Sequence, residues 1–243
     1  MVDNAILRLA EQGDAGAQYR LGWIYYKGEG VTKDMPEAIK WFRLAAKQGY
    51  ALAQHALGVC YATGDGVGLS IREAFKWYRR AAEQGCVESQ HNLGMHYFTG
   101  RGVVQNKAKA LKWFRLAAEL GDVKSQYYLG RCYADDDGIP KDLAEAVKWF
   151  RLAAEQGYAE AQTTLGGYYT GEKGLAEDWG ETVKWYRLAA EQGDAYGQLL
   201  LGLCYARGHG VKVNKKAAKR WLRSAAAQGN YEAEVMLDDL FGE

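Results

Sequence analysis

Residues 15–50 read AGAQYRLGWIYYKGEGVTKDMPEAIKWFRLAAKQGY, and this pattern returns every 36 residues without insertion or deletion. The six copies span 15–50, 51–86, 87–122, 123–158, 159–194 and 195–230. Counted from the first residue of each copy, Leu recurs at position 7, Gly at 8, Tyr at 11, Trp at 27 and Gly at 35. A fixed period of about 20–50 residues indicates a repeat architecture, in which each unit packs mainly on its neighbours.

Each copy predicts two amphipathic helices, A and then B. Positions 4, 7, 8 and 11 have the i, i+3, i+4, i+7 spacing of one helical face, and so do positions 24, 27, 28 and 31. Good N-cap residues for helix B occupy position 20 of every copy: Asp34, Ser70, Asn106, Asp142, Asp178 and Asn214. Glu37, Glu73, Glu145 and Glu181 follow three residues later, a capping-box pattern. Gly at position 35 favours a left-handed end to helix B.

Gly at position 8 is unexpected, because it lies in the middle of helix A. Glycine there costs about 1 kcal/mol relative to alanine. Its recurrence predicts that the bulky Trp and Phe or Tyr of helix B approach helix A closely at this point.

The repeat resembles the Sel-one-like repeat (SLR) family, whose pattern is A-x-A-Q-x-x-L-G-x-x-Y-x-x-G-x-G-V followed by A-x-x-W-[YF]-R-x-A-A-x-Q-G. The first copy shows it in 15–18, 28–31 and 38–43. That family is similar to tetratricopeptide repeats with a longer A–B loop. The resemblance implies an all-α, right-handed superhelical solenoid of antiparallel helix hairpins, with A helices on the concave wall. Two loops depart from the pattern, at 135–138 and at 171–174, and Thr182 replaces Ala in repeat 5.

We interpret the chain as a single SLR solenoid over 1–243. Residues 1–14 are predicted to hold an N-terminal half-repeat helix, and 231–243 a C-terminal capping helix. In this last helix Asp238 replaces the glycine of position 8, at a place where no B helix follows. A piece of a longer array would show the same pattern.

The composition argues against several partners. Lys+Arg 31 and Asp+Glu 30 give a net charge of +1, so neither nucleic acid nor membrane insertion is predicted. The run from Arg207 to Arg223 is basic, and we interpret it as a solvated end. The N-terminus shows no secretion signal, which favours the cytoplasm; a periplasmic or secreted chain whose signal peptide was removed would look the same.

No residue set predicts an enzyme, a cofactor or a metal site. Cys60, Cys132 and Cys204 share position 10, too far apart across repeats for disulfides, so they are predicted to be packing residues; a Cys60–Cys86 pair stays open. The histidines and cysteines lack metal-ligand spacing. Asp135 to Asp137 with Asp142 could attract a cation but lack the order of a calcium loop.

A partner is expected on the face of helix A that the scaffold does not use, at positions 2, 5, 6, 9, 12 and 13. By similarity to tetratricopeptide repeats this face lines the concave groove. The predicted binding residues are Tyr19, Arg20, Trp23, Tyr26, His55, His91, Met95, Phe98, Tyr127 and Arg131. Aromatic and arginine side chains on such a wall are typical of binding hot spots. Alternatively, the stripe around Trp23 packs against the helix in 4–12. In repeats 5 and 6 the same positions are small or aliphatic.

These observations predict a non-catalytic adaptor or scaffold that binds a protein or peptide and is itself a monomer. The resemblance implies two alternatives: an immunity-type binder that neutralises a toxin, and a hydrolase related to cysteine-rich SLR proteins. Assembly of copies through their ends is a third alternative, which the acidic changes in the last helix disfavour.

Overall fold

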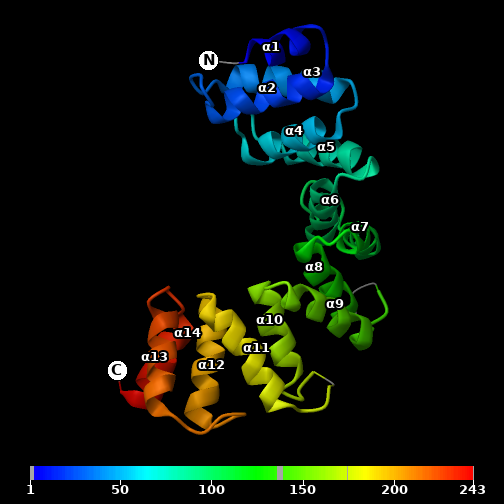
Figure 1. Ribbon diagram of the computed structural model, residues 1–243. Coiled ribbons are helices and arrows are strands. Elements are labelled where there is room, and N and C mark those ends of the chain that lie inside the picture. The colour runs from blue at the N-terminus through cyan, green and yellow to red at the C-terminus, as the bar shows by residue number, and fades with distance from the viewer. Residues whose placement is uncertain (1–2, 136–138, 174, 243) are drawn as a thin grey trace. The chain divides into compact units, whose positions relative to one another are not determined.

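The structure is a computed structural model that describes residues 3–135, 139–173 and 175–242 (Figure 1). Within these residues it contains fourteen α-helices and no strand. They are α1 (Asn4–Glu11), α2 (Ala15–Lys27), α3 (Met35–Lys47), α4 (Ala51–Thr63), α5 (Ile71–Glu83), α6 (Val87–Thr99), α7 (Lys107–Glu119), α8 (Val123–Ala134), α9 (Leu143–Glu155), α10 (Ala159–Tyr168), α11 (Trp179–Glu191), α12 (Ala195–Arg207), α13 (Lys215–Ala226) and α14 (Tyr231–Phe241).

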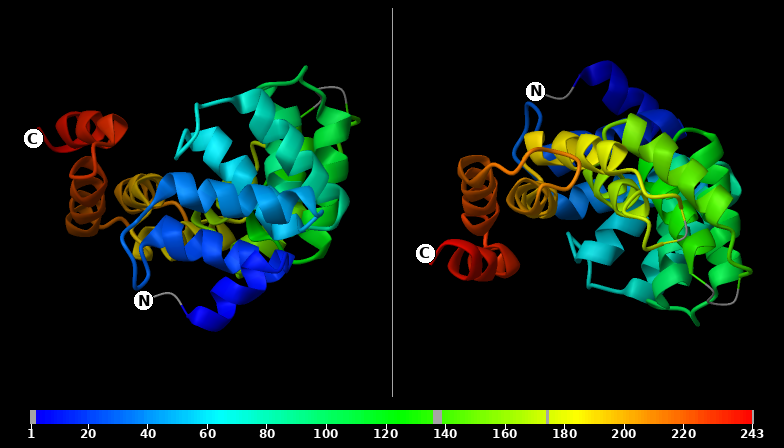
Figure 2. Two further views of the ribbon diagram at one scale, coloured as in Figure 1. Left: turned by 90° about the horizontal axis from the view of Figure 1, so that it is seen from above. Right: turned by 90° about the horizontal axis from the view of Figure 1, so that it is seen from below.

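The chain forms two compact units, Met1–Asp122 and Val123–Glu243. The first holds α1 to α7 and the second α8 to α14. In each unit every helix packs on the helices that precede and follow it, so the core is a series of helix–helix layers. At the two ends of the chain, α1 lies against α2 and α14 against α13 (Figure 2). The even-numbered helices α2 to α12 are the A helices of the six repeats, and α3 to α13 are the B helices.

The predicted N-caps of the B helices are confirmed in all six repeats. The side chain at position 20 accepts a hydrogen bond from the backbone N–H three residues later in each case. The second half of the predicted capping box, a hydrogen bond from the N-cap backbone N–H to the glutamate side chain, is wrong. The N–H of Asp34 donates to the carbonyl of Tyr25, so the cap needs no help from Glu37. Glu37 instead accepts hydrogen bonds from Lys40, at 3.0 Å.

The expected close approach at position 8 is present, and the residue responsible is the one at position 28. A Cβ atom on the glycine would lie between 2.5 and 2.9 Å from that side chain in every repeat. The six pairs are Gly22–Phe42, Gly58–Tyr78, Gly94–Phe114, Gly130–Phe150, Gly166–Tyr186 and Gly202–Leu222. All six side chains at position 28 are buried. Helix B therefore sits directly on the backbone of helix A, while the Trp at position 27 lies beside this contact.

Glutamines connect successive repeats. The amide nitrogen of Gln at position 4 donates to the carbonyl of the second Ala of the preceding B helix, as Gln18 does to Ala10 at 3.0 Å. Its amide oxygen accepts from the Gln at position 34, as in the pair Gln48–Gln18 at 2.8 Å. Equivalent side-chain pairs are Gln84–Gln54, Gln156–Gln126, Gln192–Gln162 and Gln228–Gln198. These bonds satisfy a polar side chain that is buried in the layer between repeats.

Repeat 3 breaks this pattern. Its position 34 is Leu120, which is 63% exposed and has no amide to donate. The Oε1 atom of Gln90 is consequently buried without a hydrogen-bond partner among the described residues. Leaving a buried acceptor unsatisfied costs about 1–3 kcal/mol.

The four cysteines, all among the described residues, are buried and form no disulfide with one another. Burial raises the pKa of the Cys60 and Cys204 thiols to about 11, and it raises that of Cys86 as well. Their role in packing agrees with the prediction.

In repeat 5, helix α10 ends at Tyr168, so the divergent loop that follows begins earlier than in repeats 1–3. In the loop of repeat 4, residues 136–138 lie outside the described residues.

We predict that Gly94→Ala lowers the free energy of unfolding by about 1–3 kcal/mol, as overpacked cores do. The new Cβ would lie 2.6 Å from two ring atoms of Phe114, which is held between helices. Chemical denaturation measures the loss. Gly202→Ala is the control, because its Cβ meets the softer Leu222 at 2.9 Å and the effect should be smaller. Equal losses of stability in the two variants, or a larger loss in Gly202→Ala, would contradict the proposed packing of the ring on the glycine.

Leu120→Gln should raise the free energy of unfolding by about 1 kcal/mol, because it supplies the missing donor to Gln90. The matched variant is Gln84→Leu, which removes the donor to Gln54 Oε1 and should be destabilising. Both are measured by denaturant unfolding against the unchanged chain. Opposite signs support the glutamine ladder, whereas a neutral Leu120→Gln would show that Gln90 finds another partner.

Candidate functional site

The predicted aromatic residues of repeat 1 form one cluster on α2. The Trp23 ring lies 6.3 Å from Tyr19, 5.0 Å from Tyr26 and 5.6 Å from Phe42, measured between ring centroids. Tyr19, Trp23 and Tyr26 are half-buried and pack on the core formed by α3 and α4. Ile6 and Leu7 of α1 instead share a separate apolar cluster with Ile24 and Tyr25. The stripe around Trp23 thus belongs to the core of α3 and α4, and not to the cluster that contains α1.

Polar and cationic groups surround the cluster. Tyr26 donates a hydrogen bond to Asp65 at 3.3 Å, which connects repeats 1 and 2. The ammonium of Lys27 lies 5.6 Å from the Trp23 ring, and that of Lys33 lies 5.5 Å from the Tyr26 ring. Arg20 is exposed on the same helix.

Two of the predicted histidines face neighbouring side chains. Nδ1 of His55 lies 2.8 Å from the hydroxyl of the buried Ser89, and burial lowers the pKa of this imidazole. Nδ1 of His91 lies 3.5 Å from Asp122. His55 is thus turned toward repeat 3, whereas His91 faces the last residue of its own repeat; the helical spacing alone did not predict either contact.

Phe98 differs from the expectation that it lines an open wall. Its side chain is only 9% exposed, and its ring lies 6.0 Å from that of Phe114. The ammonium of Lys107 lies 3.5 Å from the centroid of the ring. Met95 on the same helix stays half-buried and reaches a cavity.

That cavity, which we call cavity 1, lies on the A-helix side of repeats 2 and 3. Its volume is about 350 Å³. It is lined by Ala62, Tyr78, His91, Asn92, Met95, His96, Thr99 and Arg101. Nδ1 of the buried His96 donates to the carbonyl of Arg101 at 2.6 Å. Desolvation lowers the pKa of His96, so the imidazole is neutral near pH 7 and Nε2 remains an acceptor.

In the second unit, the predicted residues Tyr127 and Arg131 both lie on α8. Tyr127 packs against Tyr128, Phe150 and Tyr158, with centroids 5.3–5.7 Å apart. The Arg131 guanidinium lies 5.8 Å from the Tyr128 ring. Tyr127 also lines a second cavity, whose remaining residues were not predicted.

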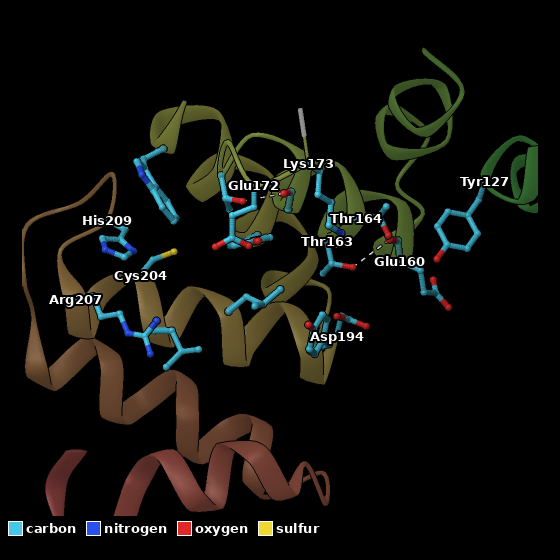
Figure 3. A pocket seen from close by; sticks show the side chains of 17 residues that line it. Tyr127, Glu160, Thr163, Thr164, Glu172, Lys173, Asp194, Cys204, Arg207 and His209 are labelled. Atoms are coloured by element: carbon cyan, nitrogen blue, oxygen red, sulfur yellow. Dashed lines mark hydrogen bonds between the residues drawn. The ribbon is translucent and has the colours of Figure 1, made fainter. Parts of the chain in front are cut away.

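This cavity 2 has a volume of about 510 Å³ and lies on the A-helix side of repeats 5 and 6 (Figure 3). It is lined by Tyr127, Glu160, Thr163, Thr164, Gly167, Thr170, Glu172, Lys173, Trp179, Tyr186, Asp194, Tyr196, Leu200, Leu203, Cys204, Arg207 and His209. Small residues create it, since Gly167 has no side chain where α2 carries Trp23. A Cβ on Gly167 would lie 3.6 Å from the Tyr186 hydroxyl and 3.8 Å from Lys173 Nζ.

Charges of both signs line cavity 2. Glu160 from α10 lies at one end, and Arg207 from α12 lies at the other (Figure 3). Glu172 and Lys173 project from the loop between α10 and α11. Asp194 also lines the cavity and accepts a hydrogen bond from the N–H of Gly197 as the N-cap of α12. The cavity can therefore pair with a ligand segment that carries charges of either sign.

The end of cavity 2 that holds Arg207 also holds Cys204 and His209 (Figure 3). The rings of Trp179 and His209 lie 4.2 Å apart at 37°. Gly210 approaches the Trp179 backbone so closely that a side chain there would overlap it. Trp179 was one of two tryptophans outside the repeat pattern, and this stacking on the next repeat explains its position.

The two cavities occupy equivalent places, 108 residues apart in the repeat register. Equivalent lining pairs are Ala62 and Thr170, Tyr78 and Tyr186, Asn92 and Leu200, Met95 and Leu203, His96 and Cys204, Thr99 and Arg207, and Arg101 and His209. Repeats 2 and 5 are the two copies with Tyr at position 28. Both tyrosines are at most 5% exposed, and neither hydroxyl has a hydrogen-bond partner among the described residues. That single deviation from Phe or Leu is the sequence signal that would have found both cavities.

Three other features of the structure bear less directly on a binding site. Within the described parts of the chain, no three His, Cys, Asp or Glu side chains come together as a metal site. The basic residues Lys216, Lys219, Arg220 and Arg223 line a shallow cavity on α13. No described helix is both long and apolar enough to cross a membrane.

The sequence matches the Sel1 repeat pattern six times, at residues 15–50, 51–86, 87–122, 123–158, 159–194 and 195–230. Among solved structures, c5321 is described as a protective antigen present in uropathogenic Escherichia coli strains displaying an SLR fold. It is 38% identical with a TM-score of 0.91, over 98% of this chain and 52% of that one. The present chain thus spans about half the length of c5321.

A Sel1 repeat protein from Oxalobacter formigenes is 35% identical, with a TM-score of 0.82, over 91% of this chain and 90% of that one. The immunity protein Pa5087 from Pseudomonas aeruginosa is 21% identical, with a TM-score of 0.52, over 90% of this chain and 83% of that one. No curated protein matches the sequence. The predicted all-α repeat fold is confirmed by the first two structures.

The stability of the protein should fall as the pH drops from 7.5 to 5.5. Burial lowers the pKa of His55 and His96, so below pH ~6.5 the unfolded chain takes up protons that the folded state does not. Denaturant unfolding at several pH values measures the slope. His96→Cys, which installs the residue found at this position in repeats 2, 4 and 6, should reduce the slope. An unchanged slope would show that His96 does not contribute.

Proposed function

Because the chain belongs to the Sel1 repeat family, we propose that it is a non-catalytic adaptor or scaffold whose A-helix side binds a segment of another protein. The family consists in general of protein-interaction modules. The finer statement, that the A-helix side is the binding surface, is supported by the two cavities there. Both are lined by residues that differ between repeats, which the scaffold does not require.

Cavity 2 is the observation that carries the proposal. It combines apolar side chains such as Trp179 and Leu203 with carboxylate, ammonium and guanidinium groups in one lining. Clefts of about 300–1,000 Å³ that combine apolar walls with a few placed polar groups are typical binding sites. A short extended segment with one apolar side chain and charged neighbours fits this combination.

The predicted contact residues of the first unit remain part of the proposal. Trp23, Tyr26 and Arg20 are of the types that dominate binding energy at interfaces. Because Trp23 and Tyr26 also pack on Phe42 and Asp65, they are already held in place before a partner arrives. Such preorganisation reduces the entropy lost on binding.

The lining of cavity 2 does not favour the hydrolase alternative. Its only thiol is Cys204, and burial raises the pKa of that group to about 11. At neutral pH the group is a protonated thiol, whereas the thiolate is the nucleophile. The nearby His209 stacks on Trp179.

Neutralisation of a toxin remains the alternative function. It would use the same surface, with a toxin as the bound protein. Pa5087 is named an immunity protein, but at 21% identity its likeness supports the fold alone. The identity of the captured partner decides between the two functions.

Filling cavity 2 tests the proposal. Gly167→Leu places a side chain in the cavity, and its Cβ has only ordinary contacts with Tyr186 and Lys173, so the variant should fold. Immobilised protein is incubated with an extract of its source cell, and the retained proteins are quantified by mass spectrometry. We expect a specific partner whose retention falls at least tenfold in Gly167→Leu.

Gly68→Leu is the matched control, since its Cβ would have no atom within 4 Å and it lies far from cavity 2 in sequence. It should retain the partner as the unchanged chain does. Retention that is equal in both variants would contradict binding in cavity 2. Loss in both would indicate an effect unrelated to the cavity.

A further inference from the structure

Cavity 1 differs from cavity 2 in its charge. Arg101 is the one Lys or Arg in its lining, and no Asp or Glu is part of that lining. Asp122 lies 3.5 Å from Nδ1 of the lining residue His91. The walls are otherwise formed by Ala62 and Met95 and by neutral polar groups. An anion entering here would meet the guanidinium of an exposed arginine that forms no ion pair among the described residues.

The backbone at Arg101 is fixed by three contacts. Its carbonyl accepts a hydrogen bond from Nδ1 of His96 at 2.6 Å. Its N–H donates to the hydroxyl of Thr99 at 3.4 Å. The next residue, Gly102, has a φ of +75° and lies so close to Ile71 that a Cβ would be 2.7 Å from Cγ2. The guanidinium therefore extends from a turn held on both sides, at the mouth of the cavity.

Tyr78 supplies a second donor. Its ring lies on Gly58, where Phe serves the same purpose in repeats 1, 3 and 4, so the hydroxyl is not needed for packing. The residue is 4% exposed, and its hydroxyl has no hydrogen-bond partner among the residues described. Burial raises the pKa of Tyr78 to about 12, and the charge of Arg101 acts against that shift. Both residues line cavity 1. At neutral pH the phenol is a hydrogen-bond donor.

We propose that cavity 1 binds the carboxylate of an aspartate or glutamate side chain on a partner protein, with Arg101 and Tyr78 as donors. A guanidinium and a carboxylate form short, charge-assisted hydrogen bonds. The single positive charge matches a single negative one, whereas a phosphate would bring about −1.5 to −2 and leave charge uncompensated. Ala62 and Met95 offer an apolar wall to the methylene groups of the entering side chain.

Cavity 2 provides an internal contrast. At the place equivalent to Arg101 it has His209, and the carboxylates in its lining (Glu160, Glu172 and Asp194) outnumber the cations (Lys173 and Arg207). A carboxylate is therefore expected to prefer cavity 1. The inference goes beyond the proposed function, because a carboxylate would bind here whether or not cavity 2 takes a protein segment.

Nuclear magnetic resonance tests the inference without a partner protein. The probe is N-acetyl-glutamate methylamide, which carries one side-chain carboxylate, and its neutral isostere N-acetyl-glutamine methylamide is the matched ligand. Ring signals of Tyr78 and His96, assigned with Tyr78→Phe and His96→Cys, are followed during titration. We expect saturable shifts with the glutamate probe and at least tenfold weaker binding of the glutamine probe.

Variants separate the donors from the scaffold. Arg101→Gln and Tyr78→Phe should each weaken binding of the glutamate probe, the arginine variant by at least tenfold. Arg72→Gln, on the exposed side of α5 in the same unit, should bind as the unchanged chain does. Gly167→Leu should also leave this binding unchanged, so a failure here is distinct from a failure in cavity 2.

Several results would overturn the inference. These are the absence of saturable shifts, equal binding of the glutamine probe, full binding by Arg101→Gln, and displacement of the glutamate probe by inorganic phosphate at lower concentration than the probe itself. The first three would remove the carboxylate site. The last would assign the cavity to a phosphate group instead.

Discussion

The packing of the position-28 side chain of helix B on the backbone of helix A governs this structure. Wherever position 8 is glycine, the side chain at position 28 rests directly on helix A, and a single Cβ atom would lie within 2.9 Å of it. The separation of the two helices in each hairpin follows from that contact. With the separation fixed, Leu at position 7 is fully buried and the Ala pair at positions 31 and 32 meets the next A helix. Interiors packed at this density do not accept an added methyl group without rearrangement.

The sequence was sufficient for those features that depend on one repeat alone. Helical periodicity, the N-cap at position 20 and the left-handed glycine at position 35 are local, so each copy predicts them independently. The capping box failed because a nearby backbone group competed for the same donor: the N–H of Asp34 is already bound by Tyr25. Glu37 then pairs with Lys40, and in repeats 4 and 5 the equivalent glutamates also accept from Trp149 and Trp185. A spacing rule names donors and acceptors that are within reach, but the tertiary fold decides which of them are still available.

The candidate site could be predicted only in part, for a related reason. A cavity forms where the side chains that face each other across two repeats are too small to fill the space between them. Gly167 and the Thr pair in repeat 5 seemed uninformative because they are small, yet their smallness opens the space beside Tyr186 and Leu203. Conversely, Phe98 seemed a strong candidate because it is aromatic, yet it fills the space beside Phe114. Residue type indicates what a side chain can do once exposed; exposure itself depends on the opposing residue.

Residues that depart from the repeat therefore fall into two physical kinds. Leu120 weakens the scaffold, since it leaves Gln90 Oε1 buried without a partner among the described residues. Tyr78 and Tyr186 leave the scaffold intact, because the ring still covers the glycine, and add a hydroxyl to a cavity. The stability of a repeat protein is close to the sum of the stabilities of its repeats and of the interfaces between neighbouring repeats. A substitution such as Leu120 therefore lowers the stability of its own repeat and leaves the other repeats unaffected. The second kind has no such cost and adds a polar group with no partner inside the repeat. A hydroxyl in that position is accessible to a ligand, whereas the orphaned amide oxygen beneath Leu120 is buried.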